Sequence, residues 1–276
     1  MRLLVAEDNL VNQQVMLTYI ENLGYQADVV ANGSDALDAL ARAPYALVLM
    51  DCDMPVMDGL TATAEIRRLE GSQRYIPIIA VTANGNRERC LIAGMDDYLA
   101  KPLRLQELAA TIARWITPTW AKESYSIGDG SMAKSDAHPP GHAYAPQHNE
   151  ESNHAAKVQP ADVFSDEHVC ERLAQLRQEC GAEMVAGFIE IFIADTSERL
   201  ARLNSLTVQA DSTAVEREAH GLKGSCANLG VEGMAALCQQ LEAEAETGSV
   251  TNVKDILERL DFEFERLKPF LDTQKI

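Results

Sequence analysis

The sequence predicts an α/β segment at residues 1–117, a linker at 118–161 and an all-α segment at 162–276. In the first segment short apolar runs alternate with stretches of helical periodicity, which is typical of a parallel sheet covered by helices on both faces. In the last segment apolar residues recur only at helical spacing. We therefore expect a five-stranded, doubly wound parallel sheet followed by an antiparallel helical bundle.

The α/β segment contains five repeats of one strand and one helix. The strands are predicted from continuous apolar runs, at residues 3–6, 27–31, 46–50, 76–81 and 98–100. The helices are predicted from apolar residues three and four positions apart, at residues 11–23, 34–43, 60–69, 87–93 and 105–115. In such a sheet, functional side chains gather at the carboxyl ends of the strands.

The linker and the last segment differ sharply in composition. Gly, Ser, Pro, Asn and His dominate residues 118–161, where periodicity disappears, so this stretch is predicted to be disordered. It holds four of the six histidines, but their spacing supports no metal site. The apolar stripes of the predicted bundle begin at Val169, Met184, Val215, Met234 and Ile256.

Composition narrows the class of partner and the compartment. The net charge of −18 argues against nucleic acid or an anionic membrane surface as the main partner. No run approaches the ~20 apolar residues of a membrane span, and no signal peptide opens the chain. The six cysteines form no zinc pattern and are typical of reduced thiols. We expect a cytoplasmic chain without a membrane segment.

Carboxylates gather where the predicted strands end. Glu7 and Asp8 follow the strand at 3–6, and Asp51 follows the strand at 46–50. Because the carboxyl ends of parallel strands meet at one edge of the sheet, these three side chains should share a crevice. Such a cluster repels itself unless a hard divalent cation neutralises it, and oxygen ligands with room for water suit Mg²⁺. A carboxylate beside Mg²⁺ can become an acyl phosphate.

Two further side chains follow the last two predicted strands. Thr82 places a hydroxyl beside the same crevice, and Lys101 places an ammonium there that can pair with the acids and hold a phosphoryl oxygen. A single polar residue at a strand end is an ordinary cap. Acids, a threonine and a lysine at four strand ends favour a phosphoryl-transfer site.

Residues 1–117 resemble a response-regulator receiver domain, whose fold is flavodoxin-like. The motifs that carry the resemblance are A-E-D-N at 6–9, L-M-D-C-D-M-P-V-M-D-G at 49–59, V-T-A-N at 81–84 and Y-L-A-K-P at 98–102. The resemblance implies that Asp51 is the phosphoacceptor. It also implies that Mg²⁺ is held by Glu7, Asp8, Asp51 and the backbone carbonyl of Asp53, with Asp8 preferred over Glu7 as a direct ligand.

The same resemblance assigns roles to four other positions. Thr82 should bind the phosphoryl group, with Tyr98 as the aromatic switch coupled to it. Lys101 should hold a phosphoryl oxygen, and the peptide bond that follows it is expected to be cis. Asp58 and Gly59 should form a turn in which Gly59 supplies freedom in φ.

The D-x-D pattern of Asp51 and Asp53 also occurs in phosphatases of the haloacid-dehalogenase class. There the first aspartate is the nucleophile and the second a general acid/base. That motif normally follows the first strand of its domain, whereas this one follows the third. Met54-Pro55 also stands where the class has Thr or Val. The phosphatase is therefore kept only as a remote alternative.

His220 is the notable residue of the all-α segment. It follows Ala219 at the edge of an apolar stripe, and Lys223 and Gly224 lie on its own face one turn later. A glycine costs about 1 kcal/mol in a helix interior. We interpret Gly221 and Gly224 as giving another protein's active site access to the imidazole. A neutral imidazole is a competent nucleophile at cellular pH.

Residues 166–271, approximately, resemble a histidine phosphotransfer (HPt) domain. Its motifs here are A-H-G-L-K-G at 219–224 and L-C-Q-Q-L-E further along the chain. The resemblance implies that His220 carries a phosphoryl group on a ring nitrogen, with Nε2 favoured, and that Lys223 and Gly224 shape the docking face. His168 has no such neighbours and is expected to be a surface residue.

Together the two resemblances predict a bacterial two-component phosphorelay. A sensor histidine kinase would phosphorylate Asp51, Asp51 and His220 would exchange the phosphoryl group, and His220 would pass it to a downstream response regulator. The other hypothesis is a phosphorylation-gated binding switch, in which His220 is a docking element or phosphate sink. The sequence shows no ATP-binding kinase core, so the chain is expected to be either a stand-alone relay protein or the C-terminal part of a hybrid histidine kinase.

Overall fold

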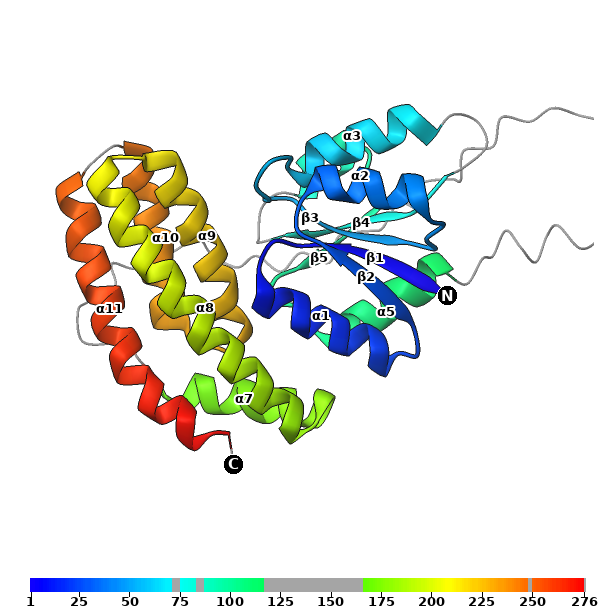
Figure 1. The fold of residues 1–276 in the computed structure, drawn as a ribbon. Coiled ribbons are helices and arrows are strands. Elements are labelled where there is room, and N and C mark those ends of the chain that lie inside the picture. Colours follow the sequence, from blue (N-terminus) through cyan, green and yellow to red (C-terminus); the bar gives the residue numbers. More distant parts are fainter. Residues whose placement is uncertain (71–74, 83–86, 117–165, 248–249, 276) are drawn as a thin grey trace, which may run out of the picture.

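The computed structural model describes residues 1–70, 75–82, 87–116, 166–247 and 250–275. The predicted linker, its four histidines and the last two residues of the V-T-A-N motif lie outside these described residues. The described residues form an α/β domain and a helical bundle that lie side by side (Figure 1). None of the described helices combines the length and apolarity that crossing a bilayer requires.

The α/β domain contains the predicted five-stranded parallel sheet, in the order β2-β1-β3-β4-β5. The strands are β1 (Arg2–Ala6), β2 (Gln26–Val30), β3 (Val48–Asp51), β4 (Ile78–Thr82) and β5 (Asp97–Ala100). Strand β4 begins two residues later than predicted, after Pro77, which has no N–H to donate to a ladder. The pairing of Asp51 with Val81 and of Thr82 with Ala100 brings the candidate residues to one edge of the sheet.

Helices cover both faces of this sheet. They are α1 (Leu10–Asn22), α2 (Gly33–Arg42), α3 (Gly59–Glu70), α4 (Arg87–Ala93) and α5 (Leu105–Ile116). Successive strand residues alternate between two cores, as a side-chain period of two requires. Leu3 and Val5 pack toward α1 and α5, whereas Leu4 and Ala6 pack toward α2, α3 and α4.

The second body is the predicted helical bundle. Its helices are α7 (Asp166–Cys180), α8 (Ala182–Gln209), α9 (Ser212–Asn228), α10 (Glu232–Thr247) and α11 (Val250–Thr273). Helices α8, α9, α10 and α11 run along the bundle, and α7 crosses one end of it (Figure 1). Phe188, Phe192 and Phe264 are fully buried in its core, where the rings of Phe192 and Phe264 meet edge to face.

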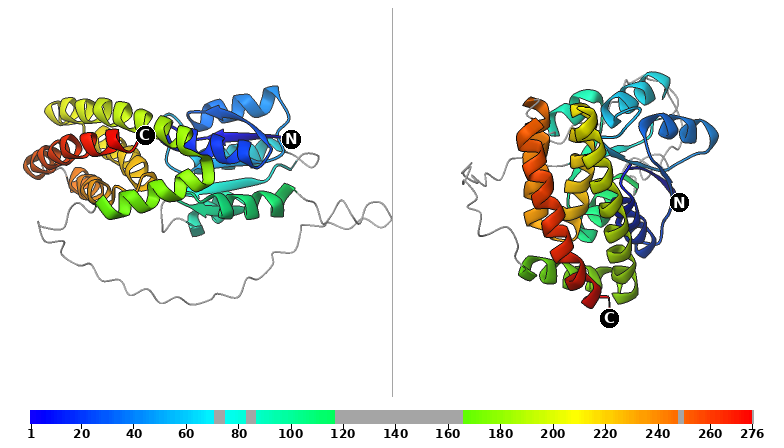
Figure 2. Two further views of the ribbon diagram at one scale, coloured as in Figure 1. Left: turned by 90° about the horizontal axis from the view of Figure 1, so that it is seen from below. Right: turned by 60° about the vertical axis from the view of Figure 1, so that its left-hand side comes forward.

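Helix α1 joins the two bodies, a contact that the sequence did not predict. It lies against the bundle (Figure 2), where it packs on α7, α8 and α9. Apolar residues of α1 and of the bundle form one continuous core. Tyr19 of α1 is fully buried there, and its hydroxyl donates to Glu179 Oε2 of α7 at 2.5 Å. The Arg172 guanidinium also donates to the Leu103 carbonyl of the other domain.

The expectation for Asp58 and Gly59 was wrong. Asp58 precedes α3 and accepts a hydrogen bond from the Thr61 N–H at 2.7 Å, which is how a helix N-cap residue acts. Gly59 is the first residue of α3 and does not have positive φ. A glycine is needed there for close approach, because a Cβ would lie 2.0 Å from the Asp51 carbonyl oxygen.

Candidate functional site

Three carboxylates and one ammonium meet at the carboxyl edge of the sheet. Glu7, Asp8 and Asp51 each offer an oxygen, and these atoms lie within 4.8 Å of one another. Lys101 Nζ lies 2.6 Å from Asp51 Oδ2 and 2.9 Å from Glu7 Oε2. The structure therefore brings together the acids and the lysine that the sequence predicted, and the Lys101–Pro102 peptide is cis as expected.

Crowding of these acids shifts their protonation. Burial and the neighbouring Glu7 raise the pKa of Asp8 to about 6. Burial and Glu7 likewise raise the pKa of Asp51 well above its usual range, although Lys101 opposes the shift. This cluster holds more negative charge than one lysine balances, so it fits a divalent cation bound by oxygen ligands.

The remaining predicted residues of this domain lie around the cluster. Thr82 is buried at the end of β4. Tyr98 points outward, 40% exposed, with the Arg87 guanidinium 5.2 Å from its ring centroid. The Asp53 N–H donates to Asp51 Oδ1 at 3.3 Å, and the Asp53 carboxylate is half-exposed at the mouth of the site.

His220 lies on α9 with a carboxylate partner that the sequence reasoning missed. Its Nδ1 lies 3.0 Å from Glu242 Oε1, and Lys223 Nζ lies 2.5 Å from Glu242 Oε2. Glu242 Oε1 is buried and has no other partner among the described residues, so it is satisfied when Nδ1 carries the ring proton. Burial alone would raise the pKa of Glu242, but the contacts with His220 and Lys223 outweigh it and lower that pKa.

These contacts define what the imidazole can do. A proton held on Nδ1 leaves the lone pair of Nε2 available as a nucleophile. Lys223 is partly committed to Glu242, so it acts beside a carboxylate and not as an isolated charge. His168 is exposed, as expected, and pairs with Glu232.

The packing of α1 on the bundle turns His220 toward the acid cluster. His220 Nε2 lies 3.6 Å from Asp53 Oδ2, two residues after the predicted phosphoacceptor. A Cβ on Gly224 would lie 3.3 Å from Asn12 Nδ2, so this glycine leaves room for the start of α1 to approach α9.

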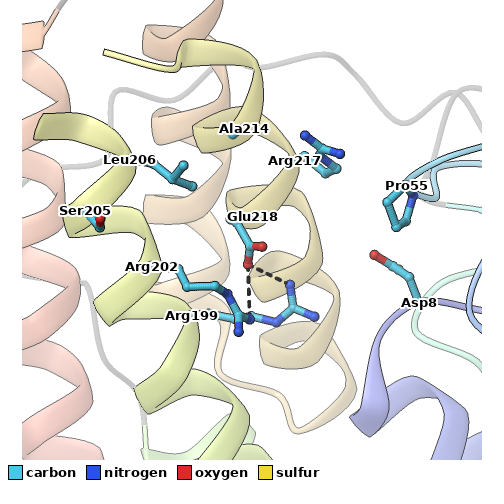
Figure 3. A pocket seen from close by; sticks show the side chains of 9 residues that line it. All are labelled: Asp8, Pro55, Arg199, Arg202, Ser205, Leu206, Ala214, Arg217 and Glu218. Atoms are coloured by element: carbon cyan, nitrogen blue, oxygen red, sulfur yellow. Dashed lines mark hydrogen bonds and ion pairs between the residues drawn. The ribbon is translucent and has the colours of Figure 1, made fainter. Parts of the chain in front are cut away.

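Gly221 has a different role from the one expected. A Cβ there would lie 2.4 Å from a guanidinium nitrogen of Arg199, a buried residue of α8 that pairs with Asp195 and Glu218. The glycine thus makes room for a side chain of its own domain. In Figure 3 this arginine and Asp8 face one another across a pocket of about 360 Å³ between the two domains.

Comparison with known proteins assigns a family to each of the two domains. The family described as the response regulator receiver domain matches residues 3–113, and the Hpt domain family matches residues 187–269. The sensor protein GacS of Pseudomonas syringae pv. syringae is 31% identical over 247 residues. The histidine-protein kinase BarA of Escherichia coli is 27% identical over 267 residues.

The chain corresponds to only part of these relatives. The matches cover 87% and 95% of this chain but 24% of GacS and 26% of BarA, about a quarter of their length. Among solved structures, the receiver domain of a Pseudomonas aeruginosa sensor histidine kinase, with a magnesium ion coordinated in its active-site cleft, is 48% identical. It covers 42% of this chain and 98% of its own, with a TM-score of 0.40.

Proposed function

We propose that Asp51 and His220 exchange a phosphoryl group. The basis is that residues 3–113 are a response-regulator receiver domain and residues 187–269 are an Hpt domain, the two parts of a phosphorelay. The observation that carries the proposal is the docked face of α9, on which His220 Nε2 lies 3.6 Å from Asp53. A sensor kinase histidine would supply the group to Asp51, and His220 would deliver it to a downstream response regulator in the cytoplasm.

The exchange is an in-line displacement at phosphorus. The Nε2 lone pair of His220 attacks the aspartyl phosphate, a P–N bond forms, and the P–O bond to Asp51 breaks to restore the carboxylate. Glu242 keeps the ring proton on Nδ1 throughout, and Lys101 holds negative charge on the Asp51 side. The reverse attack by Asp51 on phosphohistidine uses the same contacts. Thr82 is assigned to a phosphoryl oxygen, with Tyr98 as the switch that follows it.

We assign the metal site to Glu7, Asp8, Asp51 and the backbone carbonyl of Asp53. The crowded carboxylates and the raised pKa of Asp8 support this assignment. Mg²⁺, when bound, supplies positive charge that neutralises the carboxylates and the phosphoryl oxygens. Asp51 has to be ionised to attack phosphorus, and Lys101 favours the ionised form by opposing the rise in pKa that burial and Glu7 cause.

Following a radioactive label tests the proposed residues. The chain is labelled with ³²P from a small phosphodonor, and wild type is compared with Asp51→Asn and His220→Gln. In wild type we expect acid-labile label on histidine and no acid-stable label. In His220→Gln we expect label on Asp51 alone, and in Asp51→Asn we expect no label. Label that never reaches His220 in wild type would reject the exchange.

The two alternatives are not favoured. Residues 3–113 match the receiver-domain family, which argues against a phosphatase of the haloacid-dehalogenase class. A binding switch with a passive His220 gives no reason for a buried carboxylate that binds Nδ1 and leaves Nε2 facing the receiver.

Glu242→Leu should slow transfer between Asp51 and His220 by about tenfold or more, because a hydrogen bond to a charged group contributes about 1.5–3 kcal/mol. Without Glu242, the ring proton is free to occupy Nε2 and block the attack. Rapid-quench sampling of ³²P on each residue measures the rate. Glu242→Gln keeps an acceptor for Nδ1 and should retain most of the activity; equal losses in both variants would contradict a role in fixing the tautomer.

Mg²⁺ should stabilise the folded protein above about pH 6 and should have little effect on its stability at about pH 5. The raised pKa means that folded Asp8 binds a proton more tightly than the unfolded chain does, so the metal-free fold loses this stability as pH rises through about 6. Bound Mg²⁺ offsets the loss, by about 2.7 kcal/mol at about 100 times its Kd. Thermal unfolding with and without MgCl₂ at both pH values measures the effect. In Asp8→Asn the pH dependence should weaken, with Asp51, whose pKa is also raised, left as its source; an unchanged dependence would contradict the assignment.

A further inference from the structure

Four polar side chains form hydrogen bonds between the start of α1 and α9. Asn9 Nδ2 donates to Ser225 Oγ at 2.6 Å and to the Gly221 carbonyl at 2.9 Å. Asn228 Nδ2 donates to Asn12 Oδ1 at 2.5 Å. All four side chains are buried. Because a buried polar group without a partner is costly, these pairs distinguish a matching domain from one that lacks them.

The donor and acceptor of each asparagine are fixed from within the receiver. Asn9 Oδ1 caps α1 by accepting from the Asn12 N–H, which leaves the Asn9 amide nitrogen to face the bundle. Asn12 Nδ2 donates to Glu7 Oε1 at 2.8 Å, which leaves its carbonyl to face Asn228. Glu7, an acid of the proposed metal site, therefore sets the polarity of the receiver's docking face.

On α9 the network lies apart from the proposed nucleophile. Asn228 follows His220 by eight residues, about two helical turns, and Ser225 lies between them on α9. These side chains touch neither Glu242 nor the imidazole in the described contacts. Changes to Ser225 and Asn228 should therefore alter which receiver docks and how tightly, and not the transfer step.

We propose that Asn9 and Asn12, paired with Ser225 and Asn228, are the specificity determinant by which the Hpt domain selects a receiver. This inference rests on the proposed exchange between Asp51 and His220. The Hpt face accepts a receiver that presents a donor toward Ser225 and an acceptor toward Asn228. A receiver with apolar or acidic side chains at the positions of Asn9 and Asn12 mismatches one or both and is disfavoured.

The test lets one receiver choose between two Hpt domains. A donor chain with His220→Gln is labelled at Asp51, and a full-length acceptor chain with Asp51→Asn supplies the histidine. Adding Asn228→Ala to the donor weakens the pairing with its own Hpt domain. Transfer to the acceptor should then rise about tenfold, the equivalent of one hydrogen bond of about 1.4 kcal/mol.

Repeating Asn228→Ala in a donor that also lacks the Asn12 amide isolates the contribution of the Asn12–Asn228 hydrogen bond. If the donor also carries Asn12→Ala, its receiver has no amide at position 12 to accept from Asn228 of either Hpt domain, so Asn228→Ala should no longer accelerate transfer. Asn204→Ala serves as the matched control, since this asparagine pairs with Asp261 within the bundle. An Asn228→Ala effect that is absent, or equal in both backgrounds, would overturn the proposal. A donor that transfers to no acceptor at all would instead refute the exchange between Asp51 and His220.

Discussion

Replacing Lys101 with methionine should slow the labelling of Asp51 by a small phosphodonor by about a hundredfold. Lys101 Nζ lies between Asp51 Oδ2 and Glu7 Oε2, on a side chain that is 10% exposed. Burial alone would lower the pKa of Lys101, but Asp51 and Glu7 outweigh it and raise that pKa, so the ammonium stays charged. Methionine keeps an unbranched apolar stem and removes the charge that stabilises the transferring group.

The control for this variant is Lys101→Arg, which keeps the charge and should lose less activity. Removing one partner of a buried ion pair also costs about 3–5 kcal/mol of stability, so circular dichroism should confirm that the variant is folded in saturating MgCl₂. Labelling of a folded Lys101→Met chain at the wild-type rate would remove Lys101 from the proposed mechanism.

Gly59→Ala should destabilise the receiver domain by about 3 kcal/mol and lower the labelling of Asp51. The added Cβ would lie 2.0 Å from the Asp51 carbonyl oxygen and 2.9 Å from Met50 Cγ. The Asp51 carbonyl belongs to the backbone of a central strand, which cannot move without moving the proposed phosphoacceptor itself. Urea unfolding followed by tryptophan fluorescence measures the loss, since Trp115 lies in α5 of this domain.

Gly187→Ala is the matched control for Gly59→Ala. Gly187 lies inside α8, and a Cβ there would meet no heavy atom within 4 Å. Alanine should stabilise this helix by about 0.5–1 kcal/mol. If the two substitutions had the same effect, the close approach of Gly59 to Asp51 would not explain why glycine is required.

The sequence was sufficient for the sheet and for the cluster on its edge. Strand order in a doubly wound fold brings Glu7, Asp51, Thr82 and Lys101 together from four separate strand ends, so the spacing of apolar runs places them. The motif around His220 likewise gave its helix and its half-buried position.

Contacts between elements were not predictable in the same way. Glu242 lies on α10, 22 residues after His220, and periodicity within one helix cannot reveal a partner on the next. The same limit applies to Gly221, since its neighbour Arg199 comes from α8. The sequence does contain a pair of asparagines near the start of α1, Asn9 and Asn12, which are buried in the structure and form hydrogen bonds with α9.

Gly59 illustrates a second limit of prediction from the sequence. A glycine after an aspartate is typical of a turn, and sequence alone does not distinguish a need for positive φ from a need for space. The structure supplies the distance to Asp51 that decides between the two.

The dependence of transfer on protein concentration tests the central claim most directly, that Asp51 and His220 of one chain exchange a phosphoryl group in the docked arrangement. Wild type is labelled at Asp51, diluted about tenfold, and the appearance of label on His220 is followed over time. Since the sites are tethered, the first-order rate should not change on dilution. A rate that falls in proportion to concentration would show that transfer occurs between chains, which would contradict exchange within one docked chain.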